Sequence, residues 1–358
     1  MLIVAAACGS GGDGGPAATA PESELSAALG PAYVDTFQTL YDKAKADGET
    51  KLVIWDAAAV PNQKLYDAFM KRFPAITIDA QQVNSGDMLT KLNAEQAAGK
   101  RSADIAATGS TAMIQGSKAN NFESYSPFTA EKQKGDPVQA DAKDYFRQYK
   151  VGPKGIVYNS TLVKANEAPK GWNDLLDPKW KGKIAIRNPT INGGGNELVS
   201  DMLYDGRFGY DYLEKLAAQG LKIVSTSAEL ANAVATGQVA MGIPGDYDTY
   251  LDQKDKGAPL GYVWPTMGGV ELSELYIGVI SGAPHRSAAQ LYESWVFTPE
   301  GVRTLNQIGT YSPSEQLPDN APAGLTPYKS LDAFKAYPIA DALKYQQDII
   351  PRLKTIFK

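Results

Sequence analysis

Apolar positions along the chain recur in two alternating patterns, one with the spacing of buried strands and one with the spacing of amphipathic helices. Short apolar runs bounded by turn residues predict strands at residues 51–55, 76–80 and 103–107. Apolar residues at helical spacing predict helices at residues 32–46, 61–73, 87–98 and 111–119. Strands separated by helices of this length indicate a parallel sheet that is covered on both faces.

The same alternation returns later in the chain. Strands are predicted at residues 183–186, 222–224 and 239–243, and helices at residues 195–204, 210–219 and 227–236. Residues 331–358 are expected to form further packing helices. Two separate alternations predict an α/β protein with two doubly wound lobes, and in such sheets ligands lie beyond the carboxyl ends of the strands.

The start of the chain has a different composition. An apolar run at residues 1–7 ends at Cys8, the only cysteine, and a Gly- and Ser-rich stretch follows. This arrangement resembles a bacterial lipoprotein cleavage site, in which the cysteine carries lipid. We therefore expect a signal and lipobox remnant at residues 1–8, a flexible tether at residues 9–30, and an extracytoplasmic protein that is held to the cell membrane only by its lipid anchor. The alternative is a lone thiol in a disordered tail.

The composition narrows the class of protein. The hydrophobic content of 43% and the charged content of 21% are ordinary for a globular protein, and the net charge of −5 gives no electrostatic basis for binding nucleic acid. A single cysteine excludes an internal disulfide. No apolar run after Cys8 approaches the ~20 residues that a membrane-spanning helix needs.

The sequence contains none of the short motifs that mark common active sites. The zinc motif HExxH, the CxxC pair and the Walker loop are absent. The only histidine, His285, follows Pro284 in a predicted turn, where we expect a surface residue, and no nucleophile elbow lies near it. We therefore predict a protein that is not an enzyme and that carries no cofactor.

Several segments resemble those of one family. The longest is WNDLLDPKWKGKI at residues 172–184, and shorter matches begin at Leu40, Ser102, Gly155, Gly237 and Gly282. Together they resemble the type II periplasmic binding proteins of ABC importers, in the subgroup of ferric-ion binders and their non-iron relatives.

This resemblance implies two lobes whose connecting strands cross between them twice. Lobe 1 would comprise residues 31–154 and 263–312, and lobe 2 residues 155–262 and 313–358. The ligand would lie in the cleft between the lobes, which close around it. The implied partners are an ABC permease and its ATPase, and we expect a monomer. A receptor that signals, rather than delivers cargo, is the alternative role.

The family's iron binders hold Fe(III) with a histidine, a glutamate and two adjacent tyrosines. The resemblance puts the histidine position near Ala58 and the glutamate position on Gly109. At the paired tyrosines the sequence reads Asp246-Tyr247-Asp248, so three of the four ligands are missing. The remaining iron hypothesis is Fe(III) held by Tyr247 with Asp246 and Asp248, because phenolate and carboxylate oxygens suit this hard cation.

Residues suited to a negatively charged ligand are more numerous in the sequence than the family's iron ligands. Glycines and hydroxyls at the starts of three predicted helices expose backbone N–H groups at the positive helix ends, as phosphate and carboxylate sites require. The residues concerned are Ser85, Gly109, Ser110, Thr111, Arg187, Thr190, Asn192 and Gly193. Helix capping is the alternative explanation, with Thr190 or Asn192 as a cap. Arg187 either points at the anion or only extends its strand.

Asp246, Tyr247 and Asp248 are candidates for binding a cationic or hydroxylated part of the ligand. With the anion pocket they predict a small anionic organic ligand, such as a phosphonate, a sugar phosphate or a carboxylate. Three aromatic residues either line the cleft and stack on a ring or belong to the core. They are Trp55, Trp264 and Tyr276.

Overall fold

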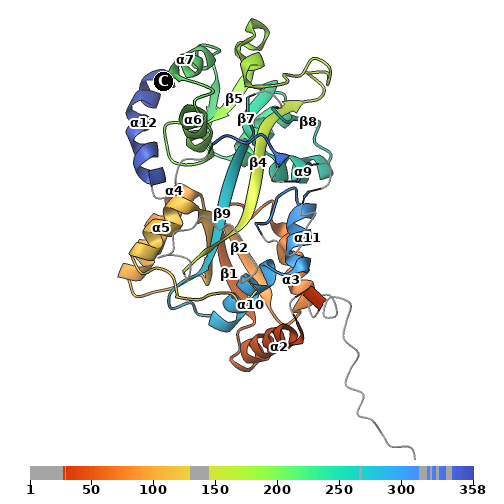
Figure 1. Ribbon diagram of the computed structural model, residues 1–358, viewed down its shortest axis with the longest axis vertical. Coiled ribbons are helices and arrows are strands. Elements are labelled where there is room, and N and C mark those ends of the chain that lie inside the picture. Colours follow the sequence, from red (N-terminus) through yellow and green to blue (C-terminus); the bar gives the residue numbers. More distant parts are fainter. Residues whose placement is uncertain are drawn as a thin grey trace, which may run out of the picture.

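Two long strands run through both halves of the molecule (Figure 1). The structure is a computed structural model that describes residues 27–28, 30–129, 145–265, 268–313, 321–322, 325–327, 330–335 and 341–358. The two strands, β4 (Arg147–Asn159) and β9 (Glu271–Val279), pair antiparallel from Arg147 opposite Ile277 to Lys154 opposite Glu271. Because each strand continues into both halves, the two lobes share a common strand pair.

Lobe 1, at the bottom of Figure 1, is built from the first part of the chain and a later helical segment. Its strands are β1 (Lys51–Asp56), β2 (Thr77–Gln82) and β3 (Ile105–Gly109). Its helices are α2 (Pro31–Ala46), α3 (Gln63–Arg72), α4 (Ser85–Ala97), α5 (Ser110–Lys118), α10 (Arg286–Val296) and α11 (Pro299–Gln307). β1 pairs parallel with β2 and β3, and β3 pairs antiparallel with β9.

Alternate residues of β1 build two separate cores in lobe 1. Leu52 and Ile54 pack with buried residues of α2, α3 and α10. Val53 and Trp55 point to the opposite face and pack with α4 and α5. The strand is therefore apolar on both faces, as expected for a central strand of a parallel sheet.

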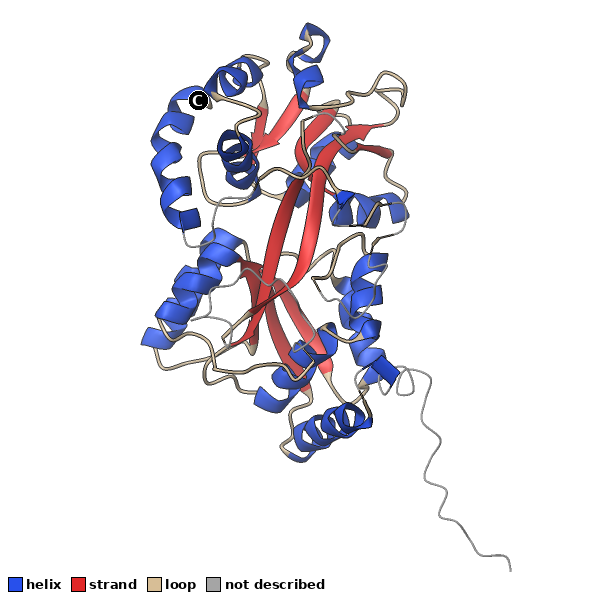
Figure 2. Cartoon of the chain, in the orientation of Figure 1, coloured by secondary structure: helices blue, strands red, loops and turns tan. Residues whose placement is uncertain are grey.

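Lobe 2 has its own strands and helices (Figure 2). Its strands are β5 (Ile184–Arg187), β6 (Lys222–Val224), β7 (Met241–Asp246) and β8 (Leu260–Val263). Its helices are α6 (Gly194–Asp205), α7 (Tyr210–Ala217), α8 (Ser227–Ala235), α9 (Tyr247–Asp255) and α12 (Ala342–Ile356), with short 3₁₀ turns η2 (Trp172–Leu176) and η3 (Pro178–Trp180). The described strands of both lobes form one sheet in the order β2-β1-β3-β9-β4-β7-β5-β6, with β8 paired to β4.

The distinctive segment at residues 172–184 packs into the core of lobe 2. Trp172 is fully buried, and its Nε1 donates to the carbonyl of Gly269 at 2.8 Å. The Asp177 side chain accepts from the Lys179 N–H and so caps η3. Ile184, the first residue of β5, lies in the same buried cluster as Trp172. This segment therefore stabilises the lobe.

The predicted α/β class with two doubly wound lobes is confirmed, whereas the residue limits of the lobes stay a prediction. The elements that the sequence did not predict include β8, β9, the first half of β4, α9 and α11. β4 was missed because it contains Pro153 and two buried lysines, which do not fit the usual pattern of a central strand. At the C-terminus the described residues hold the single helix α12, with Pro351 inside it.

Candidate ligand-binding site

The residues predicted to bind ligand come from both lobes and lie where strands end and helices begin. In lobe 1 they are Ala58 in the turn after β1, Ser85 at the start of α4, Gly109 at the end of β3, and Ser110 and Thr111 at the start of α5. In lobe 2 they are Arg187 at the end of β5, Thr190, Asn192 and Gly193 before α6, Asp246 at the end of β7, and Tyr247 and Asp248 at the start of α9.

The starts of α4, α5 and α6 lie against one another across the two lobes. A Cβ atom built on Gly109 would lie 3.9 Å from Ser85 Oγ and 3.8 Å from Oε1 of Glu197, a residue in the first turn of α6. A Cβ atom built on Gly86 would lie 4.0 Å from the carbonyl oxygen of Asn192. The predicted helix starts are thus brought together, two from lobe 1 and one from lobe 2.

None of these three helix starts has a side-chain cap among the described residues. The N-cap residues are Asn84 for α4, Gly109 for α5 and Gly193 for α6. Gly193 has a φ of 135°, a backbone conformation that residues other than glycine rarely adopt. The Thr108 hydroxyl donates to Ser85 Oγ at 2.9 Å, so the Ser85 hydroxyl hydrogen remains available to another acceptor.

The expectation that Thr190 or Asn192 caps α6 is wrong. Thr190 donates its N–H and its hydroxyl to Asn188 Oδ1, at 2.9 and 2.8 Å. The cap position belongs to Gly193, which has no side chain to offer. The first-turn N–H groups of α6 are therefore not occupied by a side-chain cap, and the positive end of the helix dipole is left without one.

Arg187 points toward the start of α6 and does not merely extend β5. A Cβ atom built on Gly194 would lie 2.2 Å from Arg187 Nη1, so the guanidinium lies directly over this glycine. The same nitrogen donates to Asp246 Oδ2 at 3.1 Å, and Asp246 also accepts from the Ser227 hydroxyl. Burial alone would raise the pKa of Asp246, but Arg187 and Lys154 outweigh it and the pKa is lowered.

Lys154, on β4, is a buried cation shared by carboxylates from three elements. Its Nζ lies 3.0 Å from Glu197 Oε2, 3.0 Å from Glu271 Oε1 and 3.9 Å from Asp246 Oδ1. Glu271 lies opposite Lys154 in the pairing of β9 with β4 and is fully buried. Burial alone would lower the pKa of Lys154, but these carboxylates together raise it above its usual value.

Two buried carboxyl groups near Lys154 bind protons more tightly than usual. Burial raises the pKa of Glu271 to about 7, with Lys154 opposing the shift and Glu197 adding to it. Burial, assisted by Glu271 and Glu197, raises the pKa of Asp201 well above its usual value. This part of the site therefore gives an incoming anion no general excess of positive charge.

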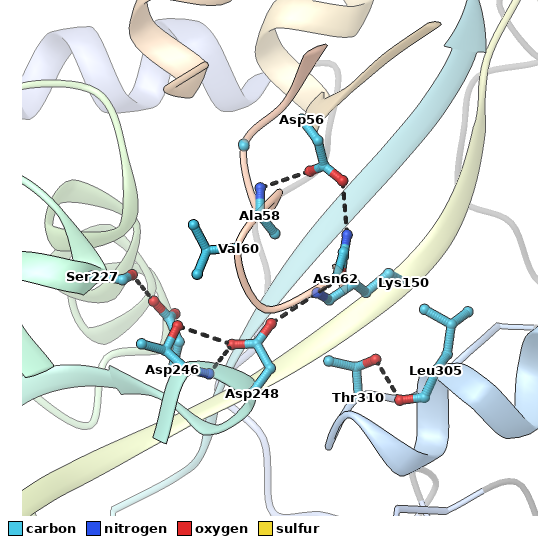
Figure 3. Close-up of polar contacts among 12 residues, drawn as sticks. Asp56, Ala58, Val60, Asn62, Lys150, Ser227, Asp246, Asp248, Leu305 and Thr310 are labelled. Carbon is cyan, nitrogen blue, oxygen red and sulfur yellow. Dashed lines mark hydrogen bonds and ion pairs between the residues drawn. The ribbon is translucent and has the colours of Figure 1, made fainter. Parts of the chain in front are cut away.

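A second buried lysine on β4, Lys150, connects the two lobes (Figure 3). Its Nζ donates to Asn62 Oδ1 at 2.7 Å and to Asp248 Oδ2 at 2.8 Å. Asn62 in turn donates to Asp56 Oδ2 at 2.7 Å, and the Ala58 N–H donates to Asp56 Oδ1 at 2.6 Å. Ala58 and Asp248, from opposite lobes, are thus joined by one chain of polar contacts, in which Lys150 neutralises Asp248.

Tyr247 packs between other aromatic rings and the opposite lobe. The centre of its ring lies 4.7 Å from that of Trp264 and 5.0 Å from that of Tyr262. A Cβ atom built on Gly309, just after α11, would lie 2.9 Å from Tyr247 Cδ1. Burial raises the pKa of Tyr247 above its usual value, which disfavours the phenolate form.

The structure also shows the environment of three further residues that the sequence analysis discussed. For Trp55 and Tyr276 the alternatives were the cleft and the core, and His285 was expected at the surface. Trp55 and Tyr276 are fully buried in the core of lobe 1, so the hypothesis that they stack on a ligand is wrong. His285, expected at the surface, is 27% exposed, and its Nδ1 lies 3.0 Å from Oδ2 of the buried Asp104. This contact connects the turn before α10 to the residue that directly precedes β3.

Several polar residues of this region were not identified from the sequence. They include Asn62, Lys150, Lys154, Glu197 and Glu271. The four-residue spacing of the two lysines is a signal in itself, because it puts both side chains on one face of a strand. The apolar pattern does not predict the strand that contains them, so their common face is apparent only in the structure.

A comparison with protein families identifies the chain. The sequence profile described as "Bacterial extracellular solute-binding protein" matches residues 64–323. The chain belongs to this family. Its members bind solutes and are not enzymes, in agreement with the resemblance found in the sequence. In the described part of this solute-binding protein, no helix is long and apolar enough to cross a membrane.

Individual relatives of this solute-binding protein are distant. A putative 2-aminoethylphosphonate-binding periplasmic protein of Salmonella typhimurium is 23% identical over 69% of this chain and 72% of its own. AfuA of Actinobacillus pleuropneumoniae, solved with fructose-6-phosphate bound, is 21% identical with a TM-score of 0.67, covering 85% of this chain and 98% of AfuA. Iron-bound HitA of Pseudomonas aeruginosa is 19% identical with a TM-score of 0.65, covering 84% and 99%. These structures support the type II periplasmic binding protein fold.

The sequence matches to curated relatives are often partial. The chain spans about half the length of several of the curated relatives that it matches. The ligand of this solute-binding protein is therefore inferred from its own site.

Replacement of Lys150 by methionine is expected to destabilise the solute-binding protein by about 3–5 kcal/mol, because Asp248 is left as a buried charge without a counterion. Urea unfolding of the wild type and K150M measures this difference. The double variant K150M/D248N is expected to be more stable than K150M, since the unpaired charge is gone. Lys64→Met, at the exposed Lys64–Asp255 pair, is the control and should leave the unfolding midpoint unchanged. Equal stability of K150M and the control would contradict the assignment.

The pKa of Glu271 predicts how stability depends on pH. Burial raises this pKa from 4.5 to about 7, so the folded protein keeps the proton at pH values where the unfolded chain has lost it. The resulting stabilisation is fully present below pH 4.5 and is lost as the pH rises to about 7. Urea unfolding between pH 5 and pH 8 is expected to show a smaller decrease for Glu271→Gln than for the wild type. If the unfolding free energy of Glu271→Gln decreased with pH as steeply as that of the wild type, Glu271 would not be the origin of the decrease. Glu214→Gln, in an exposed pair, is the charge-matched control.

Proposed function

We propose that this solute-binding protein captures a small anionic organic solute between its lobes and delivers it to a membrane permease driven by an ATPase. The solute is a phosphonate, a sugar phosphate or a carboxylate. The observation that carries this proposal is the convergence of the starts of α4, α5 and α6, which have no side-chain caps among the described residues. Helix starts of this kind supply N–H donors and a positive dipole end to an anion.

The N–H and hydroxyl donors at the helix starts can supply the free energy that such binding requires. A micromolar dissociation constant corresponds to about −8 kcal/mol. Hydrogen bonds to a charged group contribute roughly 1.5–3 kcal/mol each, partly offset by the ordering of the ligand and the lobes. Donors from three helix starts, with the hydroxyls of Ser85, Ser110 and Thr111, are enough to reach that value. Since they come from both lobes, ligand contacts also favour lobe closure.

The name of one relative and the bound ligand of another support an oxyanion ligand. The Salmonella typhimurium relative is named for 2-aminoethylphosphonate, and AfuA was solved with fructose-6-phosphate. Both compounds carry a phosphorus oxyanion, which is the kind of group that helix starts bind well. Identity near 20% does not transfer either compound to this chain, and so the class of ligand rests on the helix starts.

Iron is the second candidate, because HitA was solved with iron and the sequence keeps Tyr247 between two aspartates. The contacts of these residues favour the anion over the metal. Asp248 is paired with Lys150, and Asp246 with Arg187, so a ferric ion would have to displace a lysine and an arginine. Burial also disfavours the phenolate of Tyr247. We propose that Asp246, Tyr247 and Asp248 shape the site and do not ligate a metal.

The cellular location is also part of the proposal. We infer that Cys8 carries the lipid that holds the protein at the outer side of the cell membrane, with residues 9–30 as the tether. Cys8 and most of the tether lie outside the described residues. The support is the sequence pattern together with the extracellular family. We propose that the protein acts as a monomer and binds no nucleic acid.

Anion binding is testable by thermal shift and titration calorimetry with inorganic phosphate, methylphosphonate, glucose-6-phosphate, benzoate and Fe(III). At 100 times its dissociation constant, a true ligand stabilises the folded state by about 2.7 kcal/mol. The double variant S85A/S110A is expected to bind the best anion at least about 100-fold more weakly, because two hydroxyl donors that contribute roughly 1.5–3 kcal/mol each are lost. Ser117→Ala, whose hydroxyl bonds within α5, is the matched control. A response to Fe(III) alone would contradict the proposal.

The lipid anchor is testable in cells that export the protein. Cys8→Ser is expected to move the protein from the membrane fraction to the soluble fraction and to abolish incorporation of labelled fatty acid. Ser10→Ala, two residues away in the tether, serves as the control and should remain in the membrane fraction. Membrane association of C8S would exclude the anchor.

A further inference from the structure

Glu197 lies at the place where the anion is expected to bind. It belongs to the first turn of α6, and its N–H donates to the carbonyl of Gly193 at 2.9 Å. Its Oε1 projects toward the other lobe, 3.8 Å from where a Cβ of Gly109 would lie, and the same position is 3.9 Å from Ser85 Oγ. The carboxylate of Glu197 is thus an anion beside the starts of α4, α5 and α6.

The second oxygen of Glu197 engages the cation of the site. Oε2 lies 3.0 Å from Lys154 Nζ and 3.5 Å from Ser273 Oγ. A ligand anion at the same helix starts would approach the same lysine. Two negative groups cannot share this small space without strong repulsion, because charges repel over several ångströms at partly buried sites.

Glu197 is more exposed to solvent than its neighbour Glu271. The Glu197 side chain is 27% exposed, whereas Glu271 is completely buried on β9 and bonds Lys154 at 3.0 Å. If Glu197 swings away, Lys154 keeps Glu271 as its counterion. Among the described residues, the buried Oε2 of Glu271 has no hydrogen-bond partner. Lys154 therefore retains its contact with Glu271 when Glu197 leaves.

We propose that Glu197 is a tethered competitor for the ligand anion. Without ligand, its carboxylate occupies the space between the helix starts and Lys154. The ligand must displace it, and only an anion that offers more acceptor oxygens than one carboxylate does so efficiently. Glu197 thereby determines specificity, because it excludes weakly binding small anions and admits phosphoryl or phosphonyl groups. This inference rests on the proposed anion site.

The test is the affinity for inorganic phosphate and for acetate, measured by titration calorimetry on the full chain. Glu197→Gln keeps the shape of the side chain and removes its charge, and it is expected to bind phosphate at least tenfold more tightly than the wild type. The gain for acetate is expected to be larger, so that the preference for phosphate shrinks. Glu197→Ala, as a second variant, should show the same direction of change. Glu214→Gln removes one charge from an exposed pair in the same lobe and should bind like the wild type.

Three outcomes overturn the inference. If the wild type binds phosphate and E197Q binds it equally or more weakly, Glu197 is no competitor, although the anion site stands. The affinities for ethylphosphonate and 2-aminoethylphosphonate test whether Glu197 attracts part of the ligand instead of competing with it. If E197Q loses affinity only for the amine-bearing compound, Glu197 binds an ammonium group. If neither the wild type nor either Glu197 variant binds any anion of the panel, the proposed function fails together with the inference. Circular dichroism of each variant confirms that it is folded.

Discussion

The ion pair between Lys154 and Glu271 is the interaction on which the site depends. It joins the two strands that pass through both lobes, and both side chains are almost completely removed from water. A buried charge is tolerated only with a partner, and Glu271 is the most deeply buried of the three carboxylates that surround the Lys154 ammonium. The remaining charges follow from this pair: Glu197 and Asp246 approach the same ammonium, and Arg187 then balances Asp246. The site is therefore organised from the shared strands outward.

Much of the fold could be predicted, because hydrophobic periodicity reports burial directly. Leu52 to Trp55 are apolar at every position, and they pack on two faces of the sheet. The shared strands could not be predicted in the same way. In β4, Lys150 and Lys154 are buried through ion pairs whose partners lie far away in the sequence, at Asp248 and Glu271. A pattern that equates charge with exposure fails at such positions.

The candidate site was predictable only in part, for a similar reason. Glycines and hydroxyls before a helix report a local property, and the starts of α5 and α6 lie at Gly109 and Gly193, where such residues occur in the sequence. The partners of Asp246 and Asp248 depend on tertiary structure. Their charge suggested a cationic ligand group, but each already has an internal cation, Arg187 or Lys150. Local sequence indicates what a residue offers, and only the fold decides which neighbour uses it.

The balance of charge constrains how this protein can select a ligand. Lys150, Lys154 and Arg187 each have a carboxylate within 3.1 Å, so none of them provides a free positive charge. Attraction by net charge is therefore weak, and binding has to come from oriented N–H and hydroxyl donors at the helix starts. Such donors are directional, whereas a net charge attracts any anion. A site built in this way gains affinity only when the oxygens of the ligand match the positions of the donors. Discrimination by geometry follows directly from the neutralisation of the lysines.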